Sequence, residues 1–170
     1  ATAPFLTSKV MRILKDKVGV EDLFQEEKKE YNKKMLSIER DIWESIDNAE
    51  DKLLAGLKYA MVGNFIDFGA MDEVDDDILT EIIDTALEQE IDTKLYEEFR
   101  EELLVAERLC YIVDNAGEVV FDKLFMKVIK ELNEDIDIDI VVRGRPALND
   151  VTVEDAVEVG LDYYGDIVQN

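Results

Sequence analysis

Three side chains with oxygen donors follow two apolar segments in the second half of the chain. Asp114 and Asn115 come directly after the apolar run 109–113, and Asp150 follows a second apolar segment. The chain has no histidine and a single cysteine, Cys110, so a metal bound here would take oxygen ligands. Carboxylate and amide oxygens favour hard cations such as Mg²⁺ or Mn²⁺ over Zn²⁺. These residues predict an oxygen-only metal site that could bridge to a phosphate.

Each of the three side chains also has a structural alternative. Asn115 could cap the helix that follows it, with Glu118 reaching back to its backbone. Asp114 could be a turn residue, although a carboxylate at the end of a buried strand needs a partner. Asp150 could be another cap, but the capping pair that Thr152 starts leaves Asp150 without an obvious structural role. The three together are more specific than any one of them.

Elements on either side of these residues predict how they come together. The run 109–113 is typical of a strand buried on both faces. Helical apolar spacing follows from about residue 120 to 132, and residues 135–142 alternate with the period of a strand. Strand, helix and strand at this length predict a βαβ unit with parallel strands and a right-handed crossover. Both loops then lie at the carboxyl edge of the sheet, and the helix start near Gly117 adds an anion site.

The first hundred residues predict helices. One stops at Gly63, one starts at the acidic run 75–77, and one runs from about Thr93 to Val105 with Leu95, Phe99 and Leu103 inward. We therefore expect a mainly helical part over 1–106 and an α/β metal-binding part over 107–170.

The predicted sheet has only two strands. After residue 142 the sequence indicates a helix from about Val153 to Val159 and a short tail, and no third strand. Two parallel strands do not make a stable sheet, because parallel sheets need both faces covered. We therefore expect the sheet to be incomplete and the chain to be a piece of a longer protein.

A second polar segment lies between two predicted helices. Asn64 and Asp67 stand between two glycines, Gly63 and Gly69. The structural interpretation is a helix end and loop, with Phe65, Ile66 and Phe68 buried in the core. The functional interpretation, a substrate-binding role for Asn64 and Asp67, has equal weight.

Charge and composition exclude several classes of function. The formal net charge is −23; residues 1–60 hold 11 basic and 12 acidic residues, so the acidic excess lies in the remainder. This balance argues against a nucleic-acid groove and against an anionic membrane surface. A lone cysteine, with no apolar run long enough for a bilayer, favours the cytoplasm. Most of these carboxylates are expected to serve solubility.

Three motifs in order resemble those of the damage-control phosphatase family, long called domain of unknown function eighty-nine. They are the glycine-bracketed segment 63–69, the run 114–118 with Asp122, and the run 143–146 leading to Asn149 and Asp150. The segment from Asp22 to Asn32 also resembles the helix entry of the prokaryotic branch. The branch's amino-terminal Cys-x-x-Cys motif and the family's later lysine-bearing loop are not found in this sequence, and the chain resembles the middle of such a protein.

The resemblance implies a three-layer, Rossmann-like α/β domain beside a helical part. It implies a phosphatase that depends on Mn²⁺, Ni²⁺, Co²⁺ or Mg²⁺ and acts on small phosphorylated metabolites such as sugar phosphates or nucleotides. The metal ligands map onto Asp114, Asn115 and Asp150, with Asp114 and Asn115 catalytic. Whether water or Asp114 is the nucleophile is left open. The expected substrate-binding residues are Asn64, Asp67, Glu118, Arg143 and Arg145.

Rival functions make different predictions. An acidic helical interaction module without catalysis would bind no metal. A carboxyl methyltransferase would need a nucleotide loop richer in glycine than Gly117 alone provides. An aspartyl phosphatase of the haloacid-dehalogenase type needs a second aspartate where the chain has Ala116. The sequence does not specify an oligomeric state.

Overall fold

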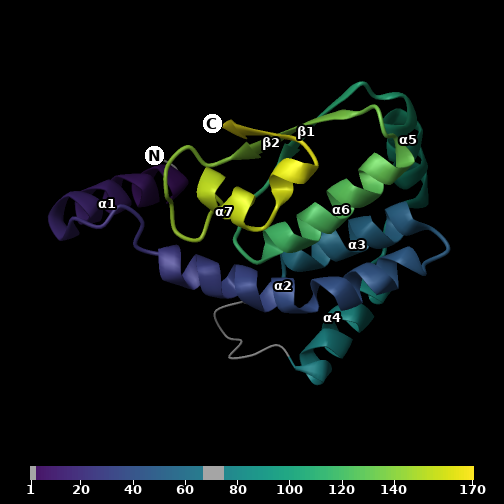
Figure 1. The fold of residues 1–170 in the computed structure, drawn as a ribbon, viewed down its shortest axis with the longest axis horizontal. Helices are drawn as coiled ribbons and strands as arrows, with labels where there is room; N and C mark the ends of the chain where they lie inside the picture. The colour runs from purple at the N-terminus through teal and green to yellow at the C-terminus, as the bar shows by residue number, and fades with distance from the viewer. Residues whose placement is uncertain (1–2, 67–74) are drawn as a thin grey trace.

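A computed structural model describes residues 3–66 and 75–170 as a layer of helices beneath a small sheet (Figure 1). The amino-terminal helices precede the sheet, and the last helices connect its strands. The helices are α1 (Ala3–Val18), α2 (Gln25–Asp47), α3 (Lys52–Gly63), α4 (Asp76–Glu88), α5 (Thr93–Val105), α6 (Glu118–Leu132), α7 (Val153–Glu158) and the 3₁₀ turn η2 (Leu161–Tyr163). The strands are β1 (Arg108–Ile112), β2 (Asp137–Val142) and β3 (Asp166–Gln169).

Acidic caps fix the starts of the helices that the sequence predicted. Asp75 accepts a hydrogen bond from the backbone N–H of Ile78 at 2.9 Å and begins α4. Asp92 does the same for α5 by accepting from Leu95 at 3.0 Å. Side-chain oxygens at this position satisfy N–H groups that have no partner within the helix. The predicted starts of these two helices are confirmed.

The sheet is parallel, with the order β1-β2-β3. Arg108 pairs with Asp137 at the start of β1 and β2, and Asp139 pairs with Asp166 at the start of β3. The βαβ unit is confirmed, with α6 as its crossover. The expectation of no third strand is wrong, because residues 166–169 pair with β2 in the tail that the sequence left without structure.

Two glycines allow β3 to lie against β2. A Cβ on Gly165 would lie 2.2 Å from the backbone oxygen of Ile138, and one on Gly144 would lie 2.5 Å from the backbone oxygen of Asn170. Real side chains do not tolerate such contacts with backbone atoms. Both ends of β3 therefore depend on residues without a side chain.

Gly165→Ala tests this dependence. The added methyl group must push β3 away from Ile138, so we expect the free energy of unfolding to fall by about 1–3 kcal/mol. Urea unfolding of the purified protein measures the change. Asp166→Ala, at the exposed next residue, is the control and should change the free energy by less than about 0.5 kcal/mol. Equal effects of the two substitutions would contradict the proposed role of Gly165.

Helix α6 is the centre of the core. Its residues Phe121, Met126 and Ile129 are almost completely buried. Tyr59 of α3 stacks on Phe121 with ring centroids 6.4 Å apart. Phe125 packs against Tyr111 of β1, with ring centroids 6.3 Å apart. Helix α6 therefore lies between the sheet and the layer formed by α2 and α3 (Figure 1). The predicted division into 1–106 and 107–170 stays a prediction.

Some predicted burial is wrong. Strand β1 alternates between exposed and half-buried residues, and Ile112 is 74% exposed. The reason is that its face with Arg108, Cys110 and Ile112 is not covered by the described residues. In α5, Leu95 is exposed, because the helix turns Tyr96 inward, where its hydroxyl donates to Asp51 at 2.7 Å.

The observed architecture is a helix-rich α/β fold with a small parallel sheet. Within the described ranges, no helix combines the length and apolarity needed to cross a bilayer.

Candidate functional site

The loops that follow β1 and β2 are joined by backbone hydrogen bonds. Asn115 and Asp150 form an isolated antiparallel bridge. On one side of it, the N–H of Val151 donates to the carbonyl of Asp114 at 2.8 Å, and on the other, Ala116 donates to Asn149 at 2.9 Å. The prediction that these loops are neighbours at the carboxyl edge of the sheet is confirmed. The three residues proposed as metal ligands therefore lie on adjacent backbone segments.

Asn115 does not cap α6 with its side chain. The residue at the cap position is Gly117, with φ 85°, a conformation that favours glycine. The Asn115 amide instead donates from Nδ2 to Oε2 of Glu118 at 3.2 Å. This bond turns the amide nitrogen toward Glu118 and leaves the amide oxygen for another partner. The orientation suits an oxygen ligand to a cation.

Glu118 is buried at the start of α6, with 4% of its surface exposed. Burial raises the pKa of its carboxyl, hydrogen bonds from Asn115 oppose this, and the charge of Asp114 adds to the rise. Asp114 itself is exposed at the end of β1. The negative charge of Asp114 disfavours the ionised form of its neighbouring carboxyl groups. A cation bound at Asp114 would offset this repulsion.

Asp150 has a structural partner that the sequence did not indicate. Its Oδ2 accepts a hydrogen bond from Nε of Arg143 at 2.6 Å. Burial raises the pKa of the Asp150 carboxyl, and Arg143 partly offsets the rise. The expectation that Asp150 lacks a structural role is therefore wrong. Arg143 and Arg145 are both exposed, and their substrate-binding role stays a prediction.

The glycine-bracketed segment begins beside Glu118. A Cβ on Gly63 would lie 3.1 Å from Cγ of Glu118, so the end of α3 packs directly on the start of α6. Asn64 follows as an exposed residue at the end of α3. Phe65 is 73% exposed and does not enter the core, whereas Ile66 is partly buried and packs against it. Asp67 lies outside the described residues, so its predicted role stays a prediction.

A buried carboxyl lies one helical turn behind Glu118. Asp122 is 5% exposed and accepts a hydrogen bond from the hydroxyl of Tyr111 at 2.6 Å. Burial raises the pKa of Asp122 to about 8; the Tyr111 bond opposes this, and the charges of Glu118 and Asp114 add to it. Sequence reasoning identified Asp122 only as part of a motif, because its burial depends on the packing of α6.

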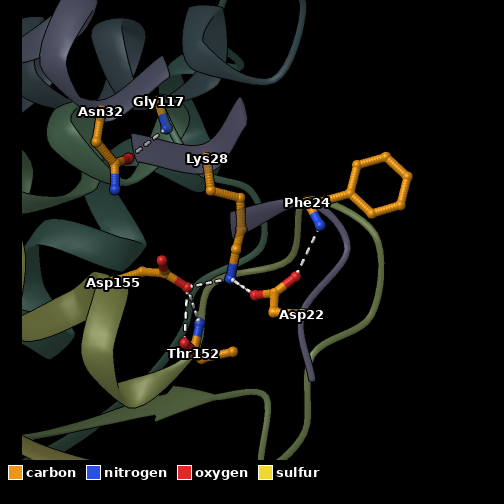
Figure 2. A network of polar contacts seen from close by, with 7 residues as sticks. All are labelled: Asp22, Phe24, Lys28, Asn32, Gly117, Thr152 and Asp155. Carbon is orange, nitrogen blue, oxygen red and sulfur yellow. Dashed lines mark hydrogen bonds and ion pairs between the residues drawn. The ribbon is translucent and has the colours of Figure 1, made fainter. Parts of the chain in front are cut away.

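A polar network from α2 reaches the starts of α6 and α7, which follow the two loops (Figure 2). Lys28 contacts Asp22 at 2.7 Å and Asp155 at 2.5 Å, and Asn32 accepts a hydrogen bond from the N–H of Gly117 at 2.8 Å. Sequence reasoning singled out only the segment that carries Lys28 and Asn32. The only sequence signal for these residues is their spacing of four on α2, since Asp155 is 127 positions from Lys28.

The donor set is a small one. Within residues 3–66 and 75–170, no group of three or more His, Cys, Asp or Glu side chains could hold a metal ion. The predicted set contains two carboxylates and one amide, with backbone and substrate oxygens as further donors. This composition suits Mg²⁺ or Mn²⁺, which commonly keep water and substrate oxygens among their ligands.

Comparison with known proteins places the chain in a family. The damage-control phosphatase ARMT1-like domain matches residues 1–170. A damage-control phosphatase of Archaeoglobus fulgidus is 29% identical over 165 residues, which are 95% of this chain and 55% of that protein. A damage-control phosphatase of Pyrococcus horikoshii is 33% identical over 112 residues, which are 66% of this chain and 38% of that protein.

The fold matches as well. A crystal structure of a DUF89 family protein from Pyrococcus horikoshii superposes with a TM-score of 0.77 at 28% identity, covering 95% of this chain and 55% of that one. The chain thus spans about half the length of the relatives it matches. The resemblance predicted from the motifs is confirmed, and the chain belongs to the damage-control phosphatase ARMT1-like domain family.

Proposed function

We propose that the protein containing this chain is a metal-dependent phosphatase that hydrolyses small phosphorylated metabolites, such as sugar phosphates or nucleotides. One observation carries the proposal: the backbone bridge between Asn115 and Asp150 brings the oxygen donors of two loops together. Two relatives are named damage-control phosphatases, which supports the reaction class. The site lies in the part of an α/β fold where ligands bind.

Asp114, Asn115 and Asp150 would hold Mn²⁺, Ni²⁺, Co²⁺ or Mg²⁺. When bound, the cation supplies charge that stabilises the phosphate oxygens in the transition state. The bond from the Asn115 amide to Glu118 fixes which atom of that amide faces the ligand. Arg143 pairs with Oδ2 of Asp150, so the cation would bind the other carboxylate oxygen or displace the guanidinium.

Substrate contacts come from residues around these loops. Arg143 and Arg145 follow β2, and a guanidinium is suited to paired hydrogen bonds with a phosphate. Asn64 at the end of α3 would contact a sugar hydroxyl, since the preceding Gly63 packs against Glu118. Asp67 and Glu118 complete the proposed substrate-binding set. The three-layer, Rossmann-like arrangement is proposed for the whole protein, together with a cytoplasmic location.

Metal-supplemented assays of the full-length protein test the proposal. We expect phosphate release from sugar phosphates or nucleotides in the presence of Mn²⁺, Ni²⁺, Co²⁺ or Mg²⁺, and none after chelation. We also expect Mn²⁺ to raise the thermal midpoint, because binding to the folded state stabilises it by about 2.7 kcal/mol at a hundred times the dissociation constant. Absence of both effects would leave an interaction module as the better interpretation. Heat on titration with S-adenosylmethionine would instead favour a methyltransferase.

A further inference from the structure

Two buried polar side chains of α2 contact the segments that follow the two loops of the proposed site. Lys28 and Asn32 are each 1% exposed and are four residues apart, so they lie on the same face of the helix. Lys28 reaches toward the start of α7, while Asn32 reaches toward the start of α6 (Figure 2). A single helix thus contacts the start of α6 directly and the segment after Asp150 through Asp155.

Asn32 holds the turn that follows Asn115. Its Oδ1 accepts the N–H of Gly117, a donor at the start of α6 that has no partner within the helix. Its Nδ2 is buried with no hydrogen-bond partner among the described residues. The bond to Gly117 is therefore the contact that orients the amide, and it fixes the backbone two residues after Asn115.

Lys28 holds the turn that follows Asp150. The carboxylate of Asp155 accepts three hydrogen bonds. They come from Lys28, from the N–H of Thr152 at 2.8 Å and from the Thr152 hydroxyl at 2.7 Å. The backbone of Thr152 also forms an isolated parallel β-bridge with that of Arg143. Asp22 anchors the other side of the ammonium and accepts the N–H of Phe24 at 2.9 Å, just before α2 begins. Lys28 thereby ties α2 to the backbone two residues after Asp150.

We propose that Lys28 and Asn32 are positioning residues that set the spacing between the loop of Asp114 and Asn115 and the loop of Asp150. Both side chains are buried, so neither is placed to contact the substrate. Their effect passes through Gly117 and Thr152. The inference rests on the proposed function, because loop spacing matters for metal binding only if the two loops share a metal.

Asn32→Leu and Asn32→Asp in the full-length protein separate positioning from general packing. Leucine removes the acceptor for Gly117, whereas aspartate keeps an oxygen in that place. Aspartate also replaces the buried amide nitrogen, which has no partner, with a second oxygen and adds an ionisable group. We expect Asn32→Leu to weaken Mn²⁺ binding at least about tenfold, within the range for removing a group that orients a metal ligand. We expect Asn32→Asp to stay closer to wild type. Titration calorimetry with MnCl₂ measures both.

Hydrogen exchange gives a readout that needs no metal. In the metal-free protein, Asn32→Leu should speed exchange of the Gly117 amide, and Lys28→Met should speed exchange at Thr152 and leave Gly117 unchanged. Asn48→Leu is a matched control, since Asn48 caps the far end of α2 by donating to the Glu44 carbonyl at 2.8 Å. It should change neither Mn²⁺ affinity nor exchange at the loops.

The outcomes distinguish the two hypotheses. If the wild type binds no Mn²⁺, the proposed function fails, and the role of Asn32 is decided by the exchange rate at Gly117 alone. If the wild type binds Mn²⁺ but Asn32→Leu retains the same affinity and exchange rate, the positioning proposal is overturned. Should Asn32→Leu not fold, Asn32→Ser provides the comparison, because its shorter side chain also loses the bond to Gly117.

Discussion

Asp114→Asn is expected to lower metal-dependent phosphate release by the full-length protein at least about a hundredfold, the loss typical of removing one preorganised electrostatic contact. The substitution keeps the shape of the side chain and removes its charge. Asp114 is exposed at the end of β1, so the fold does not need that charge. Phosphate release at saturating Mn²⁺ and the Mn²⁺ dissociation constant measure the effect.

Stability should respond to the same substitution in the opposite direction. The charge of Asp114 raises the pKa of Glu118, Asp122 and Asp150, although burial is the largest cause in each of the three. Removing the charge relieves repulsion in the metal-free protein, so the free energy of unfolding should stay equal or increase slightly. Lost activity with retained or increased stability is the pattern expected of a residue kept for function.

Asp162→Asn is the matched control. Asp162 is an exposed acid in η2, and its substitution removes the same charge without touching either loop. Its activity should equal that of the wild type. If Asp114→Asn also retained full activity and full Mn²⁺ affinity, the assignment of Asp114 as a ligand would be wrong, and the cation would have to bind elsewhere.

Local signals in the sequence were sufficient for the elements near the site. Asp75 and Asp92 cap the helices whose starts the sequence predicted. The parallel βαβ unit followed from spacing alone, and with it the meeting of the loops after β1 and β2. These features depend on residues a few positions apart and on the length of chain between the two strands, which favours parallel pairing, so no tertiary information was needed.

Features that depend on distant neighbours were missed. The apolar run 109–113 predicted a strand buried on both faces, but a run of residues carries no information about whether a second layer covers it. Strand β3 has only two apolar residues, Ile167 and Val168, and depends on the close approach that Gly165 allows. The contact of Lys28 with Asp155 joins residues 127 positions apart. Such pairs have no local signature.

Asp122→Asn is expected to stabilise the metal-free protein, and increasingly so as the pH rises. The folded protein raises the pKa of Asp122 to about 8, mainly by burial, whereas an unfolded aspartate has a pKa of about 3.9. Between about pH 4 and pH 8 the folded state therefore holds more protons than the unfolded state. The free energy of unfolding must fall as the pH rises through this window, and the fall ends above the folded pKa.

The amide variant has no such dependence. Asparagine offers the same acceptor to the hydroxyl of Tyr111, so the hydrogen bond at 2.6 Å can be retained. The gain in unfolding free energy over the wild type should be small near pH 4 and should reach on the order of a few kcal/mol at pH 8. Urea unfolding at pH 4.5, 6 and 8 measures the difference, in which titrating groups that do not interact with Asp122 cancel. A difference that is flat with pH, as expected for Asp162→Asn, would contradict the raised pKa.

Adding Mn²⁺ then tests why the protein keeps the destabilising buried carboxyl of Asp122 one helical turn from Glu118. A cation held by Asp114 and Asp150 would favour the charged form of nearby carboxyls, so it would lower the pKa of Asp122. The pH dependence of stability that Asp122 causes should therefore shrink when Mn²⁺ saturates the wild type. Burial without a partner cation is unfavourable for a carboxylate, and the bound metal would reduce that cost. A pH dependence that Mn²⁺ leaves unchanged would place the cation too far from α6 to act on Asp122.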